Sequence, residues 1–283
     1  MQTVIAVAMH KPSAVPDAPP YLPVQAGAAV HAPMGVQRDD EGENISGRNP
    51  LYCELTAHYW LWKNAAAEAY GLCHYRRYFT RHPRSGNSLS QPKADSSLGE
   101  RALAGLLTQE EIDALLETAD VIVPRPRLYL IETNWSHYAH AHRESDLQQL
   151  RAVIGDACPD DLPAFDRVMK RRWGRRFNMF IMRREWFEAY SAWLFGVLFE
   201  LETRLGSDIP PRTMGFIAER LMDVWLERTR PRVKQLPVLH TEGQNWPEKI
   251  AGFLRRKFTS EKNETECSAD AFILAEDFHE RRF

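Results

Sequence analysis

The stretch Tyr70-Gly71-Leu72-Cys73-His74-Tyr75-Arg76-Arg77-Tyr78-Phe79 begins as an apolar, strand-like run and ends in a histidine, two arginines and three aromatic residues. Arginine binds phosphate through a rigid fork of donors and keeps its charge, so two adjacent guanidinium groups suit an anionic ligand. In open α/β sheets, ligands bind where strands end at their carboxyl edge. The stretch therefore predicts a buried strand over 70–74 and a phosphate site of His74, Arg76 and Arg77 at its end. Since adjacent residues point in different directions, we expect one arginine to bind ligand and the other to be structural.

Short apolar runs of strand length alternate with amphipathic runs of helix length on both sides of this stretch. One helix opens with a capping box, in which Thr108 is followed three residues later by Glu111. Residues 12–35 are rich in Pro, Ala and Gly and predict an irregular loop with short elements. The alternation indicates an α/β fold with a mostly parallel central sheet flanked by helices. Strands are predicted at 3–8, 70–74, 120–124, 177–182 and 233–239, and helices at 51–64, 108–118, 146–153, 162–173, 184–204 and 214–228.

The chain changes character near residue 243, where it becomes charged and loses its periodicity. We therefore divide it into one domain over 1–242 and a partly helical C-terminal extension over 243–283. A short helix over 246–258 would carry apolar residues on one side and end in Arg255-Arg256-Lys257. Such a helix suits the surface of an anionic membrane, although packing against its own domain explains it equally well.

The composition excludes several classes of protein. Lys and Arg total 36 against 38 Asp and Glu among 283 residues, so no overall basic field favours nucleic acid as a partner. The four cysteines are scattered without CxxC spacing, which predicts reduced thiols in a cytoplasmic protein and neither a zinc site nor a disulfide framework. The start of the chain lacks the basic region of a signal peptide, and no apolar run is long enough to span a bilayer. Membrane contact is therefore expected to be peripheral at most.

Two segments near the first strand and the aromatic helix add polar residues to the predicted phosphate site. The first follows the strand over 3–8, where a nucleotide site and an ordinary strand-to-loop junction are equally good interpretations. The second precedes the helix over 51–64, and helix N-termini attract anions. Capping accounts for Asn49 in front of Pro50, but it leaves the other polar residues unexplained. The candidates from the two segments are His10, Lys11, Asn44, Ser46, Arg48 and Asn49.

Glu219 and Glu54 are the candidate catalytic carboxylates. Glu219 follows Arg212 and Gly215 near the start of the helix over 214–228, and a carboxylate in the first helical turn is stabilised as the anion that a general base requires. Simple pairing with the helix dipole explains the same pattern. Glu54 is expected one turn into the helix over 51–64, where a lone glutamate is usually a surface residue.

Sugar-binding side chains are predicted in the second half of the domain. Asn134, Trp135 and His137 can bind a sugar, because an aromatic ring stacks on a pyranose while amide and imidazole groups bond to its hydroxyls. The spacing of His137, His140 and His142 matches no closed zinc pattern. Asn178, with Arg175-Arg176 before it, lies where the strand over 177–182 starts, although solvated charges beside a core strand are the simpler interpretation. Arg212 completes this acceptor set.

Familiar nucleotide and hydrolase motifs are absent from the sequence. There is no Gly-x-Gly-x-x-Gly, no Walker sequence and no Gly-x-Ser-x-Gly. Dinucleotide-dependent oxidoreductases, P-loop enzymes and α/β-hydrolases therefore lose their main support. Asp39-Asp40 lies in a loop and makes a weak metal-binding pair.

Several motifs follow one another in a fixed order along the chain. They are Val7–Pro12, Glu43–Ser46, Asn49–Ala57, Trp60–Asn64, Gly71–Phe79, Asn178–Met182 and Gly215–Leu221. Together they resemble the capsular and exopolysaccharide biosynthesis family known as domain of unknown function 4422. The resemblance covers roughly residues 3–240 and not the tail after about 243. It implies a bacterial glycosyltransferase of GT-A-like fold, which transfers a sugar, for example galactose in pyranose or furanose form, from a nucleotide diphosphate donor to a glycan acceptor that is often lipid-linked.

The resemblance also sharpens the site. Many GT-A enzymes end a strand in Asp-x-Asp, which holds a divalent metal on the donor diphosphate, whereas this strand ends in His74-Tyr75-Arg76-Arg77. We therefore expect guanidinium groups to neutralise the diphosphate without a required cofactor, with a divalent metal as the alternative. Inverting GT-A enzymes often carry their base at the start of a late helix, so the resemblance implies that Glu219 is the base, with Glu54 and Glu132 in reserve.

Two other classes of function remain open at this point. A phosphate-binding hydrolase or nucleotidyltransferase would use the same arginines, and it would release product without a glycan acceptor. A non-catalytic glycan-binding assembly protein would bind glycan but no nucleotide diphosphate. The buried position expected for the arginines argues against the second.

Overall fold

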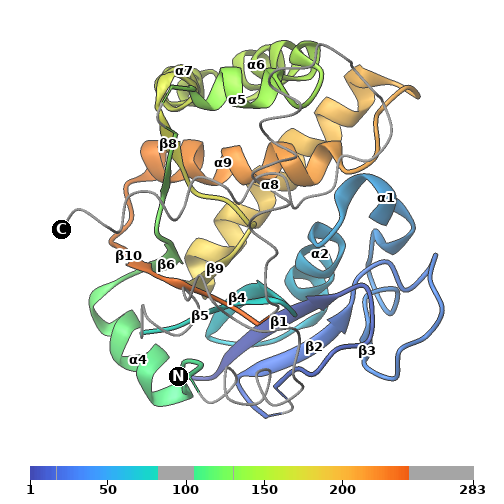
Figure 1. The fold of residues 1–283 in the computed structure, drawn as a ribbon, viewed down its shortest axis with the longest axis vertical. Helices are drawn as coiled ribbons and strands as arrows, with labels where there is room; N and C mark the ends of the chain where they lie inside the picture. The colour runs from blue at the N-terminus through green and yellow to red at the C-terminus, as the bar shows by residue number, and fades with distance from the viewer. Residues whose placement is uncertain (17, 82–104, 130, 242–283) are drawn as a thin grey trace.

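The computed structural model describes residues 1–16, 18–81, 105–129 and 131–241. A mixed sheet lies at the centre, with strands in the order β10-β6-β9-β4-β1-β2-β3 (Figure 1). Every pair in this order is parallel except the two that β9 makes with β4 and β6. The strands are β1 Thr3–Met9, β2 Tyr21–Gln25, β3 Gln37–Arg38, β4 Ala69–His74, β6 Val121–Pro124, β9 Phe180–Arg183 and β10 Val233–Leu236.

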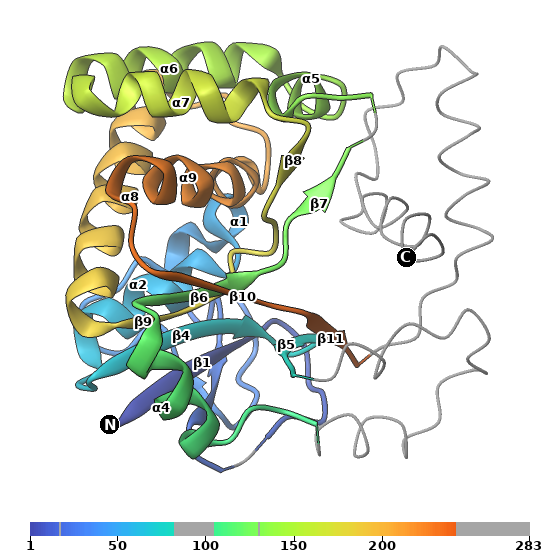
Figure 2. The same ribbon diagram turned by 90° about the vertical axis from the view of Figure 1, so that its left-hand side faces the viewer.

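Four short strands complete the β structure of the described residues, two in the central sheet and two apart from it. β5 (Arg77–Phe79) turns straight back from β4, and β11 (Val238–His240) pairs with β5. β7 (Arg127–Leu128) and β8 (Trp173–Gly174) form a separate antiparallel pair. In Figure 2 this pair lies between the central sheet and the outermost helices.

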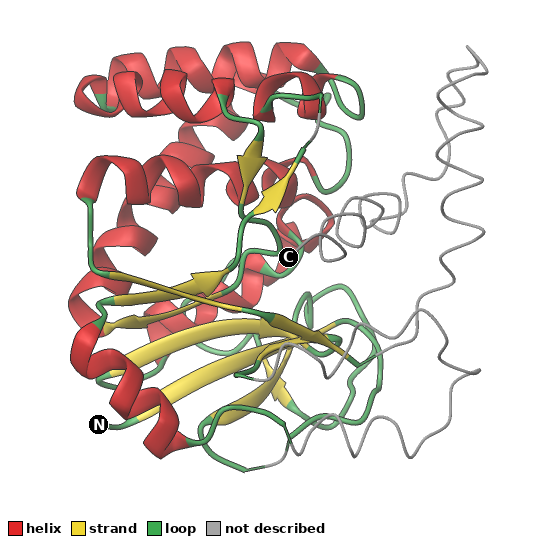
Figure 3. Cartoon of the chain, turned by 60° about the vertical axis from the view of Figure 1, so that its left-hand side comes forward, coloured by secondary structure: helices red, strands yellow, loops and turns green. Residues whose placement is uncertain are grey.

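The helices are distributed unequally over the two faces of the sheet. α2, α8 and α9 pack on one face with α5, α6 and α7 as a layer beyond them, and α4 covers the other face (Figures 2 and 3). The helices are α1 Asn49–Tyr52, α2 Leu55–Asn64, α4 Gln109–Thr118, α5 Asn134–Ala139, α6 Glu144–Ala157, α7 Leu162–Lys170, α8 Arg184–Leu205 and α9 Thr213–Thr229, with 3-10 turns at Ser46–Arg48 and Pro159–Asp161.

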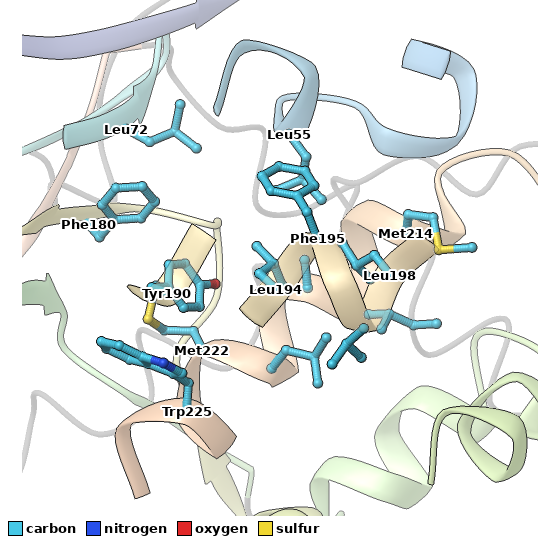
Figure 4. Packing of buried hydrophobic residues seen from close by; sticks show 14 of the residues in the cluster. Leu55, Leu72, Phe180, Tyr190, Leu194, Phe195, Leu198, Met214, Met222 and Trp225 are labelled. Carbon is cyan, nitrogen blue, oxygen red and sulfur yellow. The ribbon is translucent and has the colours of Figure 1, made fainter. Parts of the chain in front are cut away.

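Alternate residues of the strands enter two separate cores. Ala6 and Ala8 of β1 face the larger core, whereas Ile5, Val7 and Met9 face the smaller one under α4. Figure 4 shows the larger core, where side chains of β4 and β9 meet those of α8 and α9; the labelled residues there include Leu72, Phe180, Tyr190, Leu194 and Trp225. Because β1 and β4 are buried on both faces, their sequences are continuous apolar runs.

Gly71 marks the closest approach between strands in the centre of the sheet. A Cβ added there would lie 2.9 Å from the side chain of Ile5 and 3.1 Å from the backbone oxygen of Phe180. β4 lies between β1 and β9, so a side chain at this position would push its two neighbours apart. The close packing of β4 between β1 and β9 thus explains why a glycine occupies position 71.

Several predicted boundaries need correction. The helix predicted over 51–64 is two helices, because Cys53 adopts φ 50° and ψ −128° and ends α1 before α2 begins. Arg48, and not Asn49, is the N-cap of α1. β2 lies inside the segment predicted to be an irregular loop, and the last predicted strand is divided into β10 and β11.

Other predictions agree with the structure or lie beyond it. α4 begins with the expected capping box of Thr108 and Glu111. None of the helices in the described part of the chain is long and apolar enough to cross a membrane. The C-terminal extension over 243–283, with its helix predicted over 246–258, lies outside the described residues.

Candidate functional site

A cavity of about 480 Å³ opens at the edge where β1 and β4 end, between that edge and the start of α9. Its charged and imidazole groups come from segments far apart in the sequence. Six arginines face two glutamates there, so the cavity is strongly cationic. The groups are Arg76, Arg77, Arg127, Arg176, Arg212 and Arg220, with Glu54, Glu219, His10, His31, His74 and His142.

Half of the candidate residues named from the sequence line this cavity. The sixteen candidates divide evenly: one set reaches the cavity wall, and the other supports structure around it or lies elsewhere. The first set is His10, Asn49, Glu54, His74, Arg76, Arg77, Arg212 and Glu219. The second set is Lys11, Asn44, Ser46, Arg48, Asn134, Trp135, His137 and Asn178.

The cationic wall at the sheet edge is built by the turn from β4 to β5. His74 and Arg77 are opposite each other across this turn, which brings Arg76 and Arg77 to the cavity together. His10 Nε2 lies 3.2 Å from the hydroxyl of Tyr75. Burial, and then the charges of Arg77 and Arg76, hold the pKa of His74 well below its usual range, so the imidazole is neutral at neutral pH. His74 therefore adds a hydrogen-bonding group and no charge.

Arg77 and Arg76 both line the cavity, and the expectation that one of them binds ligand while the other is structural stays a prediction. The Arg77 guanidinium lies 4.5 Å from the centre of the Phe177 ring. Burial, and then the charges of Arg76 and Arg127, lower the pKa of Arg77, whereas the charges of Glu219 and Glu54 oppose this effect. Among the described residues Arg77 makes no ion pair.

Glu54 reaches the cavity because the chain is kinked just before it. Cys53 has a left-handed φ, so Glu54 becomes the N-cap residue of α2 and does not lie one turn into a helix as predicted. Its Oε1 accepts a hydrogen bond of 2.8 Å from Asn178 Nδ2. Burial raises the pKa of Glu54, and the charge of nearby Glu219 adds to that effect, whereas the Asn178 hydrogen bond opposes it.

Glu219 lines the same cavity from α9. It lies nearly two turns beyond Thr213, and no acidic residue occupies the first turn, so the predicted stabilisation by the helix dipole is wrong. The carboxylate contacts two local groups instead. Its Oε1 accepts a 3.1 Å hydrogen bond from the Phe177 backbone N–H, and its Oε2 lies 3.5 Å from Arg220 Nη1.

Asn178 lies behind the carboxylates and does not line the cavity. Its Nδ2 donates to Glu54 and also, over 3.0 Å, to the backbone oxygen of Gly215. Phe177 and Asn178 have φ of 83° and 50°, so two consecutive residues are left-handed. This geometry presents the Phe177 N–H to Glu219 and the Asn178 side chain to Glu54.

The polar loop before α1 stabilises itself. Asn44 donates to the backbone oxygens of Asp40 and Gly42, and Ser46 Oγ donates over 2.5 Å to the buried carboxylate of Asp39. Arg48 points away from the cavity and pairs with Glu202 of α8 at 2.9 Å. Asn44, Ser46 and Arg48, which were predicted to bind the sugar donor, therefore have local structural partners. Lys11 lies exposed, 5.6 Å from the centre of the Tyr75 ring.

The predicted sugar-binding residues of α5 are similarly occupied. Asn134 is buried and donates to backbone oxygens of Val168 and Trp173, while the Trp135 indole donates to Glu144. The His137 ring packs at a tilt against Tyr129, with ring centroids 4.3 Å apart, and its Nδ1 lies 3.3 Å from Arg220 Nη2. Glu132, the reserve base, lies 2.9 Å from His140 and not in the cavity.

Several cavity residues were not singled out as site residues from the sequence. Arg127 follows the short strand β6, Arg176 and Phe177 lie between β8 and β9, and Arg220 follows Glu219 on α9. The Phe177 ring lies 4.5 Å from the guanidinium carbons of both Arg77 and Arg127. The pair Arg175-Arg176 was noticed in the sequence, but solvated charge was the simpler interpretation there.

The described residues at this edge do not fit a divalent cation of the kind that many GT-A enzymes hold. No group of three or more His, Cys, Asp or Glu side chains in the described part of the chain is arranged to bind a metal ion. Guanidinium and imidazole groups stand at the ends of β1 and β4, where carboxylate ligands would be needed.

Comparison with known proteins gives two matches. The model of the family described as Domain of unknown function (DUF4422) matches residues 4–230. The solved structure described as the apo structure of the bifunctional glycosyltransferase WbbM is similar over 85% of this chain, with a TM-score of 0.75 and 31% sequence identity. This chain spans 45% of that protein's length. No curated protein matches. The likeness confirms the α/β fold with a mostly parallel central sheet flanked by helices that the sequence predicts.

Proposed function

Since the chain belongs to the DUF4422 family, we propose that it is a glycosyltransferase that moves a sugar from a nucleotide diphosphate donor to a glycan acceptor. The observation that carries the proposal is the cavity, where six guanidinium groups and two carboxylates meet at the carboxyl edge of the sheet. The likeness to the bifunctional glycosyltransferase WbbM supports it. Bacterial capsule, exopolysaccharide or O-antigen synthesis, with galactose as the sugar, is the setting that we propose, at the inner face of the plasma membrane or in the cytoplasm.

The donor diphosphate is assigned to the sheet-edge cluster, which we define as His10, His74, Arg76 and Arg77. When the bond between the anomeric carbon and the diphosphate breaks, negative charge grows on the departing oxygen. Fixed guanidinium groups stabilise that charge as it forms, and they need no metal to do so. A neutral His74 can donate to a phosphate oxygen without a loss of charge from the site.

Glu219 is assigned as the general base of an inverting reaction. It removes the proton from the acceptor hydroxyl while the oxygen attacks the anomeric carbon and the diphosphate leaves from the opposite face. Its carboxylate accepts a hydrogen bond from the Phe177 N–H and lies beside Arg220, which fixes its position in the cavity. The raised pKa of Glu54 favours its protonated form, so Glu54 suits a hydrogen-bonding role better than that of base.

A binding screen tests the donor assignment first. We expect nucleoside diphosphates or nucleotide sugars to raise the melting temperature, because a ligand stabilises the folded state by RT ln(1 + [L]/Kd). Arg77→Gln should weaken that binding by roughly tenfold to a hundredfold, since a charge-assisted hydrogen bond is lost. Arg48→Gln is the matched control, because Arg48 pairs with Glu202 away from the cavity and its loss should leave binding unchanged.

Product analysis then separates transfer from the alternatives. A transferase releases nucleoside diphosphate only when a glycan acceptor is present, and it continues to do so in the presence of EDTA. Release without acceptor would instead identify a hydrolase. Binding of glycan with no nucleotide binding would identify an assembly protein. Complete loss of turnover in EDTA that Mn²⁺ or Mg²⁺ reverses would contradict the metal-free part of the proposal.

A further inference from the structure

The cavity has a second cationic group of residues besides the sheet-edge cluster. Arg127, Arg176 and Arg220, defined here as the second arginine cluster, come from β7, from the segment after β8 and from α9. The Phe177 ring lies 4.5 Å from the guanidinium carbons of both Arg77 and Arg127. One aromatic ring therefore contacts an arginine of each cluster.

Arg176 and Arg220 are buried charges with mostly neutral partners. Arg176, 6% exposed, donates to the Arg175 backbone oxygen and to Asn134 Oδ1 at 2.6 and 2.7 Å. Arg220, 1% exposed, donates to the Phe216 backbone oxygen at 2.6 Å and faces Glu219 at 3.5 Å. The Nε atoms of both have no hydrogen-bond partner among the described residues. Burying a charge without full pairing is costly, so the arrangement calls for an anion from outside.

The neighbouring Arg175 shows what a compensated arginine looks like at this position. Arg175 is 8% exposed, forms an ion pair of 2.5 Å with Asp223, and does not line the cavity. Arg176, the next residue, lines the cavity and has no carboxylate partner among the described residues. The Nε atoms of both residues lack a hydrogen-bond partner among the described residues. The difference between the two is therefore the carboxylate, which Arg175 has in Asp223 and Arg176 lacks.

The second cluster lies on the side of the cavity that carries the proposed base. Arg220 follows Glu219 on α9, and the two side chains are 3.5 Å apart. A base must contact the acceptor hydroxyl. We propose that the second arginine cluster binds an anionic group, carboxylate or phosphate, carried by the glycan acceptor. This inference rests on the proposed function for its assignment to the acceptor, while the presence of a second anion site does not.

Calorimetry with inorganic pyrophosphate on the full chain tests the second site without any knowledge of the acceptor. We expect two binding events, of which saturating UDP removes one and leaves the other. A single event, or the loss of both events in UDP, would overturn the proposal. If UDP does not bind but two events remain, the second anion site stands and the proposed donor assignment fails, so the two failures can be told apart.

Variants assign the two events to their residues. Arg176→Gln and Arg220→Gln should each weaken the pyrophosphate binding that remains in saturating UDP by roughly tenfold to a hundredfold. The affinity of each variant for UDP should stay within about twofold of that of the unmodified chain. Arg77→Gln should weaken the other event. Equal loss of UDP binding in Arg176→Gln and Arg77→Gln would overturn the division. Melting curves verify that each variant folds. If neither variant folds, the pyrophosphate titration of the unmodified chain, with and without UDP, decides whether a second anion site exists.

Two further titrations distinguish the sources of the anion. If a sugar carboxylate occupies the second arginine cluster, D-glucuronate should bind the UDP-loaded chain better than D-glucose does. If a phosphate occupies the cluster, methyl phosphate should bind better than D-glucose. Either result supports the proposal when Arg176→Gln abolishes it. If Arg176→Gln selectively weakens UDP-glucuronate relative to UDP-glucose, the anionic group belongs to the donor, and the assignment to the acceptor is wrong.

Discussion

Two consecutive residues, Phe177 and Asn178, hold both carboxylates of the cavity. The Phe177 N–H donates to Glu219, the Asn178 amide donates to Glu54, and both residues are left-handed. Asparagine adopts this conformation more readily than most residues, whereas an aromatic residue does so at a cost. Left-handed backbone of this kind is often retained where it places functional groups, and here it places four of them: two carboxylates and, through the Phe177 ring, two guanidinium groups.

Two replacements of Asn178 distinguish the contribution of its side chain to stability from that of its left-handed backbone. Asn178→Ala should destabilise the fold by about 1–3 kcal/mol, because two hydrogen bonds are lost and alanine tolerates φ 50° poorly. Asn178→Gly removes the same side chain without the conformational penalty. We expect denaturant unfolding to rank the two variants with glycine the more stable. The opposite order would show that the left-handed backbone carries no strain.

Replacement of Glu219 tests the assignment of the base. Glu219→Gln should lower kcat by roughly 10²–10⁴-fold, the usual contribution of a general base. Nucleotide binding should change little, since glutamine can still accept the Phe177 hydrogen bond. Glu54→Gln is the matched control and should retain most of the turnover. Near-normal turnover in Glu219→Gln, or a larger loss in Glu54→Gln, would exchange the two roles.

At the scale of a secondary-structure element, β4 has little room for a side chain at Gly71. Gly71→Ala should destabilise the protein by about 1–3 kcal/mol, because the added methyl group meets the Ile5 side chain and the Phe180 backbone within 3.1 Å. Gly196→Ala on the exposed side of α8 meets nothing within 4 Å and should stabilise by about 0.5–1 kcal/mol. Urea unfolding of both variants measures the difference. Equal effects would mean that the sheet accommodates the methyl group.

Elements with strong local signals were predictable, and those decided by distant contacts were not. The capping box fixed the start of α4, and continuous apolar runs marked β1 and β4. β2 was missed because Pro23 and the Pro- and Gly-rich surroundings hide a strand that exists only through its pairing with β1 and β3. The kink at Cys53 leaves no local trace, since nothing in the sequence demands a left-handed cysteine.

The same limit applies to the cavity. Residues after β1 and β4 could be placed there from the rule that ligands bind at the carboxyl ends of parallel strands. Arg127, Arg176 and Arg220 could not, because their position depends on how β7, β8 and α9 fold over the sheet. Asn44, Ser46 and Arg48 were polar for local reasons that the sequence alone did not distinguish from ligand binding.

For the whole molecule, buried histidines predict loss of stability in acid. His58 is fully buried, and burial lowers its pKa from 6.5 to about 3. Below pH 6.5 the unfolded chain therefore binds a proton at His58 that the folded chain does not bind. The contribution of neutral His58 to the free energy of unfolding is complete above pH 6.5 and is lost as the pH falls toward 3. Between pH 6.5 and 5 it amounts to about 1.5 kcal/mol. His142, with a pKa lowered to about 4, acts in the same direction.

His58→Gln tests this contribution. Glutamine can still bond to Ser191, which lies 2.8 Å from His58 Nε2, but it does not titrate. Between pH 6.5 and 4.5 the unfolding free energy of the variant should fall less steeply with decreasing pH. The difference in slope should correspond to about one proton fewer taken up on unfolding. Glu54 contributes with the opposite sign, because its raised pKa favours the folded state at low pH and is a penalty as pH rises. An unchanged pH slope in His58→Gln would contradict the expected titration.

The reversed direction of β9 determines which parts of the chain can vary independently of the cavity. Since β9 runs against its neighbours, the segment that precedes it reaches the cavity, whereas its far end leads directly into α8 at the opposite edge of the sheet. An insertion before β9 would displace Phe177 and Asn178 and with them both carboxylates. An insertion of equal length at Gly206, after α8, would leave them in place. The antiparallel strand β9 thus makes the junction before it intolerant of length variation, whereas the junction after α8 can accept an insertion.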